Sequence, residues 1–188
     1  MAAREARNRL FNVSLFVLLG LGITFFYLRA FEPKMFYQAK PLTLTLATFL
    51  VVLGIERTVL LFPGSNLYLL PGALASILLT ILWGPNLGLL AALTLPLFSL
   101  PPVDLHFEII LMLFLGSLAG VFTARGIRKR IHFLKIGLAV GAVSSAVLVG
   151  YFFSQDWRLN EALSFACFGF GNGFFVTALS FFIGLCFE

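Results

Sequence analysis

Long apolar stretches, separated by short breaks of charged residues, Pro, Gly or Asn, run through the whole chain. A helix needs about 20 apolar residues to cross a hydrocarbon core of about 30 Å. Seven stretches come close to this length, and they predict an all-α, polytopic transmembrane helical bundle of about seven spans in a single domain over residues 1–188. The stretches cover residues 10–28, 41–62, 67–83, 86–100, 107–124, 133–153 and 161–187.

The third and fourth stretches are short, and only Gly84, Pro85 and Asn86 separate them. They form either a tight helical hairpin or two half-helices of one broken element, which is tolerated where irregular backbone lies inside a membrane protein. In the second arrangement residues 67–100 cross the membrane once, and the number of spans falls to six.

The composition adds to this picture by excluding other classes of protein. Hydrophobic residues make up 60% of the chain and charged residues 11%, against about 25% charged residues in soluble domains, which excludes a soluble enzyme. Cys167 and Cys186 lie about 28 Å apart if the last stretch is one helix, which is too far for a disulfide. With eight acidic residues, two histidines and no Cys/His metal spacing, we expect no enzyme activity, cofactor or metal site in this chain.

The loop at residues 124–135 sets the orientation of the chain. It carries five cationic residues, whereas the breaks at 63–66 and 101–106 carry none, and Lys and Arg accumulate in cytoplasmic loops. We therefore expect this loop and, with seven spans, the C-terminus to be cytoplasmic, with incidental binding of anionic lipids but no binding of nucleic acid. The cationic residues are Arg125, Arg128, Lys129, Arg130 and Lys135.

The N-terminus disagrees with a seven-span count. Arg4, Arg7 and Arg9 precede the first stretch, and an odd number of spans places them on the outer side. Either the bundle has six spans with both ends inside, or a native segment before the first span fixes its orientation.

Glu56 and Arg57 are adjacent opposite charges within an apolar stretch and, with Asn172, form the candidate intramembrane polar site. A charge near the bilayer centre costs at least about 2.5–3.5 kcal/mol, so the pair needs an explanation. One explanation is a polar or signal-transmitting site inside the bundle. The other is that both side chains, about 8–9 Å from the end of their span, reach the interface by snorkelling.

Small residues repeat at short intervals in the later stretches, a pattern that lets helix backbones approach closely. We expect the fifth and sixth stretches to pack as a hairpin through these residues. The glycines around Asn172 are expected to pack against a neighbouring helix, with Asn172 hydrogen-bonded across the contact, or else to contact a ligand. The packing residues are Gly116 and Gly120, then Gly137, Gly141 and Ser145, then Gly169, Gly171 and Gly173.

Asp104, His106 and Glu108 occupy alternate positions, which brings three metal-ligand types to one side if the segment is extended. We favour a polar outer loop instead, with Glu108 at a helix start, where the helix dipole stabilises an acid.

Three segments resemble the membrane region of seven-transmembrane receptors with an intracellular HD hydrolase domain, the family of the PgpH-like cyclic di-AMP phosphodiesterases. The first is an apolar span that ends in a Gly-Pro turn. The second is a glycine-containing span followed by a basic loop, and the third is a last span that starts at Asn-Gly and ends at Glu. They read LPGALASILLTILWGPN at 70–86, GSLAGVFTARGIRKR at 116–130 and GNGFFVTALSFFIGLCFE at 171–188.

The resemblance implies a membrane anchor and signal-transmitting domain in a bacterial plasma membrane, between an extracellular sensor domain and a cytoplasmic HD hydrolase. An HD domain holds two metal ions through a His, a His-Asp pair and a further Asp. No His-Asp dipeptide occurs here, so no catalytic residue carries over. The alternative from another class is a small-solute transporter or its substrate-binding membrane subunit, favoured by the break near Gly84 and the polar residues in apolar stretches.

Overall fold

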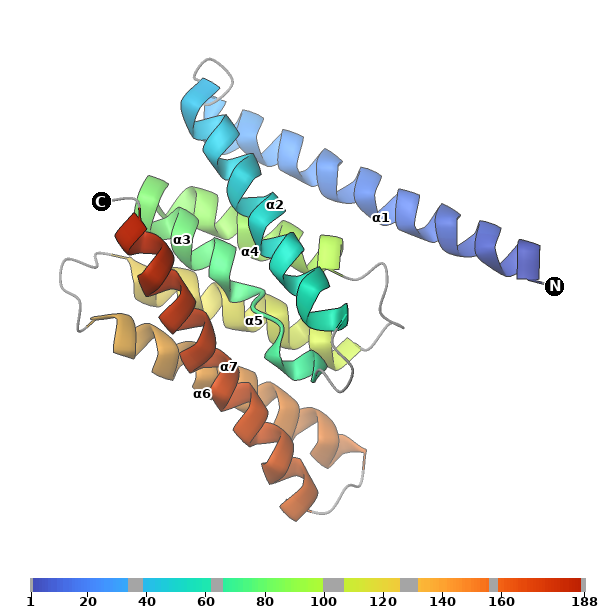
Figure 1. Cartoon of the computed structure of the whole chain (residues 1–188), viewed down its shortest axis with the longest axis vertical. Helices are drawn as coiled ribbons and strands as arrows, with labels where there is room; N and C mark the ends of the chain where they lie inside the picture. The colour runs from blue at the N-terminus through green and yellow to red at the C-terminus, as the bar shows by residue number, and fades with distance from the viewer. Residues whose placement is uncertain are drawn as a thin grey trace.

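The computed structural model describes residues 2–33, 39–61, 66–99, 107–125, 132–155 and 159–186, and these residues form a bundle of helices (Figure 1). The prediction of an all-α polytopic bundle is confirmed, and no strand occurs among the residues described. The helices are α1 (Ala2–Phe31), α2 (Ala39–Leu61), the 3-10 helix η2 (Leu67–Leu69), α3 (Ala73–Trp83), α4 (Pro85–Ser99), α5 (Phe107–Ala124), α6 (His132–Ser154) and α7 (Leu159–Cys186).

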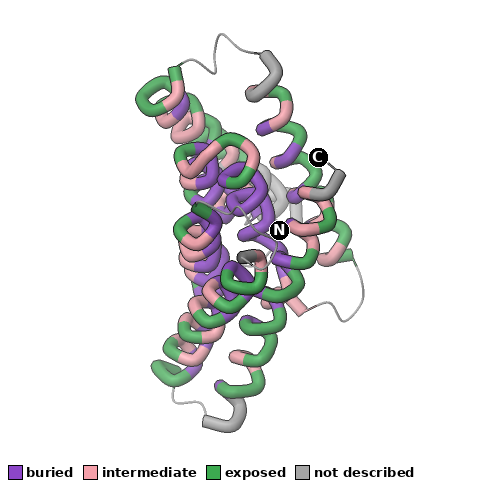
Figure 2. Tube along the Cα trace, turned by 90° about the vertical axis from the view of Figure 1, so that its left-hand side faces the viewer, coloured by how far each residue is buried: buried purple, intermediate pink, exposed green. Residues whose placement is uncertain are grey.

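Within the part of the chain that the structure describes, four helices are long and apolar enough to cross a membrane: Leu42–Leu61, Phe107–Ala124, Phe133–Ser154 and Ala162–Gly184. Shorter apolar helical segments cover Val17–Phe31, Leu67–Trp83 and Pro85–Ser99. The outward faces are apolar as well. Leu18, Phe26, Leu50 and Phe182 are 65–74% exposed, while buried positions lie toward the inside of the bundle (Figure 2). Exposed side chains of this kind suit lipid rather than water as the surrounding solvent.

Consecutive α-helices run in alternating directions between the two ends of the bundle (Figure 1). The hydrogen bond from Asn86 Nδ2 to Glu32 Oε1, 2.9 Å long, joins the start of α4 to the end of α1. Leu28, Leu87, Ala124 and Ile136 share one apolar cluster at this end. The end of α5 and the start of α6, which flank the basic loop, therefore lie at the same end as the turn between α3 and α4, and α7 finishes there too (Figure 1).

The third and fourth stretches form a helical hairpin. Gly84, the residue between α3 and α4, has φ +103° and ψ 170°, and its N–H donates to Thr80 O over 3.1 Å. A methyl group on Gly88 would overlap the Thr80 hydroxyl and lie 2.8 Å from Ser76 O, so the backbone of α4 passes directly against α3. The two helices are antiparallel neighbours, and the alternative of a single broken crossing is not what the structure contains.

The hairpin lies in the centre of the bundle. All of α3 from Ala73 to Thr80 is buried, as are nine of the fifteen residues of α4. With 11 and 15 residues, the two helices are about 16 and 22 Å long, shorter than a hydrocarbon core of about 30 Å. Longer helices around them therefore supply the lipid-facing surface.

We expect Gly84→Ala to destabilise the protein by about 1–3 kcal/mol, because this backbone conformation is open only to glycine. No atom lies within 4 Å of a methyl group placed there, so the effect is conformational rather than steric. Thermal unfolding in detergent measures it. The control is Gly22→Ala in α1, which has equally open surroundings in an ordinary helix, and an equal loss in both variants contradicts the explanation.

Candidate functional site

Glu56 lies inside the bundle. Its side chain is 1% exposed, on the same face of α2 as Val52, which is fully buried. Ser99 Oγ lies 2.6 Å from Glu56 Oε2 and 2.9 Å from Leu95 O. A serine hydroxyl has one proton to donate, so the Glu56 carboxylate of α2 and the Leu95 carbonyl of α4 share a single donor, the Ser99 hydroxyl.

Arg57 binds the same end of α4. Its Nη2 donates to Phe98 O over 3.0 Å. The last carbonyls of a helix have no partner within the helix and carry its negative partial charge, so a guanidinium is well suited to this position. Glu56 and Arg57 thus hold adjacent residues, Ser99 and Phe98, at the last turn of α4.

The two charged side chains do not bind one another. Glu56 Oε1 and Arg57 Nη1 are both buried without a hydrogen-bond partner, and each side chain bonds to α4 instead. Snorkelling to the interface does not describe Glu56, whose carboxyl group is enclosed by protein. Of the two explanations for the pair, the geometry fits a polar contact between helices.

Phe98 also contacts α1. A methyl group on Gly20, which is buried in α1, would lie 2.7 Å from the Phe98 ring. The ring of Phe98 therefore packs against α1, while its backbone carbonyl accepts the hydrogen bond from the guanidinium of Arg57. Three helices meet at this residue, and we call Glu56, Arg57, Phe98 and Ser99 the α2–α4 contact.

Asn172 makes a separate polar contact. Its Nδ2 donates to Leu70 O over 3.1 Å, in the link between η2 and α3, and that carbonyl also accepts from Gly72 N–H. Asn172 Oδ1 is buried without a partner. We expected Asn172 to form one polar site with Glu56 and Arg57, but in the structure its side chain bonds to Leu70 instead. This hydrogen bond links α7 to the start of the central α3–α4 hairpin.

Glu108 is buried, at 4% exposure, in the first turn of α5. Its side chain hydrogen-bonds to that of Tyr151 in α6, a partner the sequence gave no means to identify. Asp104 and His106 lie outside the described residues. Among the residues that the structure describes, no three His, Cys, Asp or Glu side chains gather as metal ligands do.

The glycines of α6 and α7 face one another. A methyl group on Gly141 would lie 3.0 Å from Phe170 O, and one on Gly173 would overlap Gly141 N. On the same interface Gly137 meets Thr177, Gly169 meets the backbone of Ser145, and Ser145 Oγ donates to Ala166 O over 2.7 Å. Gly171 differs, because nothing lies within 4 Å of a methyl group there, so it takes no part in this contact.

The glycines of α5 contact α6 and, at Gly120, also α3. Methyl groups on Gly116 and Gly120 would lie 3.0 Å from Ser144 Oγ and 2.8 Å from Ile77 Cγ1 of α3. The expectation that the fifth and sixth stretches pack as a hairpin is confirmed, because Gly116 and Gly120 both lie against Val140 of α6. The part that was wrong is the face of α6, since Gly137, Gly141 and Ser145 face α7 and not α5. The glycines of α6 pack against α7, so α5 packs on the opposite face of α6, which carries Val140 and Ser144.

Only the flanks of the basic loop are described. Arg125 is exposed, with its guanidinium 5.0 Å from the centre of the Phe122 ring, and Lys135 is exposed in the first turn of α6. Arg128, Lys129 and Arg130 lie outside the described residues.

The apolar spans, their lipid-facing side chains and the buried polar contacts define an integral membrane protein built as a helical bundle. A family model described as "7TM receptor with intracellular HD hydrolase" matches residues 8–188, and the chain belongs to that family. Its membrane region is thus the receptor part of a family that combines such a region with an intracellular HD hydrolase. No match was found among curated proteins or among solved structures.

Proposed function

We propose that this chain is the signal-transmitting membrane domain of a receptor hydrolase of the PgpH-like type. A displacement of α1 at the outer side of the membrane changes the α2–α4 contact, and the change reaches a cytoplasmic HD hydrolase through α7. The observation that carries the proposal is the meeting of α1, α2 and α4 at Phe98.

The route toward α7 is supported by contacts already described. The α4 helix packs along α3 at Gly88, and the start of α3 is tied to α7 by the hydrogen bond between Asn172 and Leu70. Unpartnered buried atoms on Glu56, Arg57 and Asn172 favour alternative hydrogen-bonded arrangements, because a second arrangement can satisfy atoms left unpaired in the first.

The orientation of the chain agrees with this role. The flanks of the basic loop lie at the same end of the bundle as the end of α7 (Figure 1), and clustered Lys and Arg favour the cytoplasmic side. A cytoplasmic hydrolase would then be next to the last helix, and α1 would enter from the outside.

The test replaces Glu56 and Arg57 together by leucine in the receptor as it occurs in its own membrane. We expect the hydrolysis of cyclic di-AMP by membrane vesicles to change at least about 5-fold, the lower end of typical coupling between sites. The amount of receptor in the membrane should stay the same, because leucine suits an apolar helix. Leu50→Ala, on the exposed face of α2, is the control and should leave the rate unchanged.

Two outcomes contradict the proposal. One is a rate unaffected by the double substitution while Leu50→Ala behaves as the wild type. The other is an immunoblot of the native membrane, with an antibody to residues 124–135, that shows a band near 20.7 kDa and no associated hydrolase in the same solubilised complex.

A further inference from the structure

A proline interrupts the hydrogen bonding of α4 about one turn before the helix ends. Pro96 lies inside the helix, which continues to Ser99. Proline has no N–H to donate to the carbonyl four residues back, and its ring crowds that carbonyl, so it kinks or weakens a helix interior. Here the carbonyl is that of Ala92, and both residues are buried, where bulk water does not replace the missing donor. Residues 97–99 are therefore held to the rest of α4 less firmly than its other turns.

The two parts of α4 have different neighbours. The part before Pro96 packs on α3, where a methyl group on Gly88 would overlap the Thr80 hydroxyl. Its members of the central apolar cluster are Leu87, Leu90, Ala91 and Leu95. The last turn contacts α1 and α2 instead, through the ring and the carbonyl of Phe98. The helix thus changes its partners at the proline.

The hydroxyl of Ser99 lies across this division. It is 2.9 Å from Leu95 O, which precedes the proline, and 2.6 Å from Glu56 Oε2 of α2. It has one proton to donate. Donation to Leu95 O ties the last turn to the body of α4, whereas donation to Glu56 ties it to α2.

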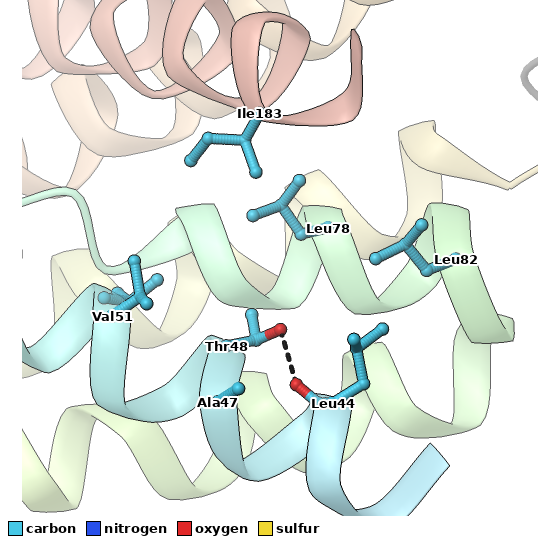
Figure 3. A pocket seen from close by; sticks show the side chains of 8 residues that line it. Leu44, Ala47, Thr48, Val51, Leu78, Leu82 and Ile183 are labelled. Atoms are coloured by element: carbon cyan, nitrogen blue, oxygen red, sulfur yellow. Dashed lines mark hydrogen bonds between the residues drawn. The ribbon is translucent and has the colours of Figure 1, made fainter. Parts of the chain in front are cut away.

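Other buried hydroxyls of the bundle show the ordinary arrangement. Thr94 of α4 donates to Leu90 O over 2.8 Å. Thr48, in an apolar crevice between α2, α3 and α7, donates to Leu44 O over 2.9 Å (Figure 3). Each of these protons goes to the carbonyl one turn back in the same helix. Ser99 differs because a carboxyl group of another helix competes for its proton.

We propose that the last turn of α4 is a hinged segment, which pivots at Pro96 and is tied by the Ser99 hydroxyl either to Leu95 O or to Glu56. In the first position the segment follows the body of α4, which lies on α3, and in the second it follows α2. The segment is the moving part of the proposed signal route, so its role in signalling rests on the proposed function. The pivot itself does not, and it is measured without a hydrolase.

Hydrogen exchange of the chain in phospholipid nanodiscs tests the pivot, with mass spectrometry that resolves single amides. We expect residues 97–99 to exchange faster than residues 90–94 of the same helix, because exchange reports local opening. Pro96→Ala restores the hydrogen bond to Ala92 O. It should slow exchange at residues 97–99 at least about 5-fold, the effect of one added hydrogen bond.

Pro85→Ala is the matched control. Pro85 is the first residue of the same helix, where a backbone N–H has no acceptor within the helix, so exchange at residues 97–99 should stay unchanged. Ser99→Ala removes the tie on both sides and should speed exchange there several-fold, and it also tests the segment if Pro96→Ala does not fold. Thr94→Val, which removes a hydroxyl in the body of α4, should have no such effect.

Three results would overturn the proposal or part of it. Exchange at residues 97–99 as slow as at residues 90–94 would show a continuous helix without a pivot. Equal rates in Pro96→Ala and the wild type would show only the fraying of a helix end. Exchange unaffected by Ser99→Ala would remove the hydroxyl from the device. None of these results bears on the hydrolysis test of Glu56 and Arg57, so failure of the hinge and failure of the proposed function are told apart.

Discussion

Replacing Gly173 by alanine is expected to lower the stability of the bundle by about 2–3 kcal/mol, the upper part of the range for overpacking an interior. The added methyl group would meet Gly141 N and lie 2.5 Å from Gly137 O. These atoms belong to helix backbone, so no rotation of a side chain relieves the clash, and α6 and α7 must separate. Unfolding by heat or by SDS titration in mixed micelles measures the loss.

Gly171→Ala is the matched control. It lies two residues away on the same helix, and nothing is within 4 Å of a methyl group there. Alanine is the better helix former, so this variant should be as stable as the wild type or more so. Equal destabilisation by both substitutions would refute the close contact of α6 and α7.

The second large effect is expected from Arg57→Leu. This change removes a hydrogen bond from a charged group to Phe98 O, which contributes about 1.5–3 kcal/mol, and leaves the carbonyl without that donor. It also leaves the Glu56 carboxyl group, 1% exposed, without the neighbouring charge. We expect a loss of about 2–3 kcal/mol, measured by the same unfolding assay.

The double variant with leucine at both positions should recover much of this loss, because a removed pair leaves no isolated charge in the interior. Glu56→Gln is the conservative comparison, since a carboxamide still bonds to Ser99 while the charge is gone. If Arg57→Leu were as stable as Leu50→Ala, the contact between Arg57 and α4 would contribute nothing to the fold.

The spans were predictable because the length of an apolar stretch is read directly from the chain. The expected span at 107–124 coincides with α5 (Phe107–Ala124), and that at 133–153 with α6 (His132–Ser154) within one residue at each end. The start of α1 was missed, since the helix continues to Ala2 through polar residues. A hydropathy pattern marks where lipid ends and not where a helix ends.

The candidate site was predictable only in part. Glu56 and Arg57 are visible in the sequence as charges in an apolar stretch, but Ser99 is 43 positions away from Glu56 and is an ordinary residue at the end of another stretch. Gly20 and Phe98 carried no signal at all. A charged residue in an apolar stretch indicates that a polar partner is needed. The identity of that partner depends on how the helices pack, and the packing is set by contacts between residues that are distant in sequence.

The direct contact of α6 and α7 at Gly141 and Gly173 limits how the last helix can move. Neither helix can rotate about its own axis without parting two backbones, so the pair shifts as one rigid unit. Between α5 and α6, by contrast, the Ser144 hydroxyl faces Gly116, and a side chain can change its rotamer. The contact between α5 and α6 is therefore less rigid at this point than the contact between α6 and α7, and a displacement of α7 is passed to α6 through backbone atoms.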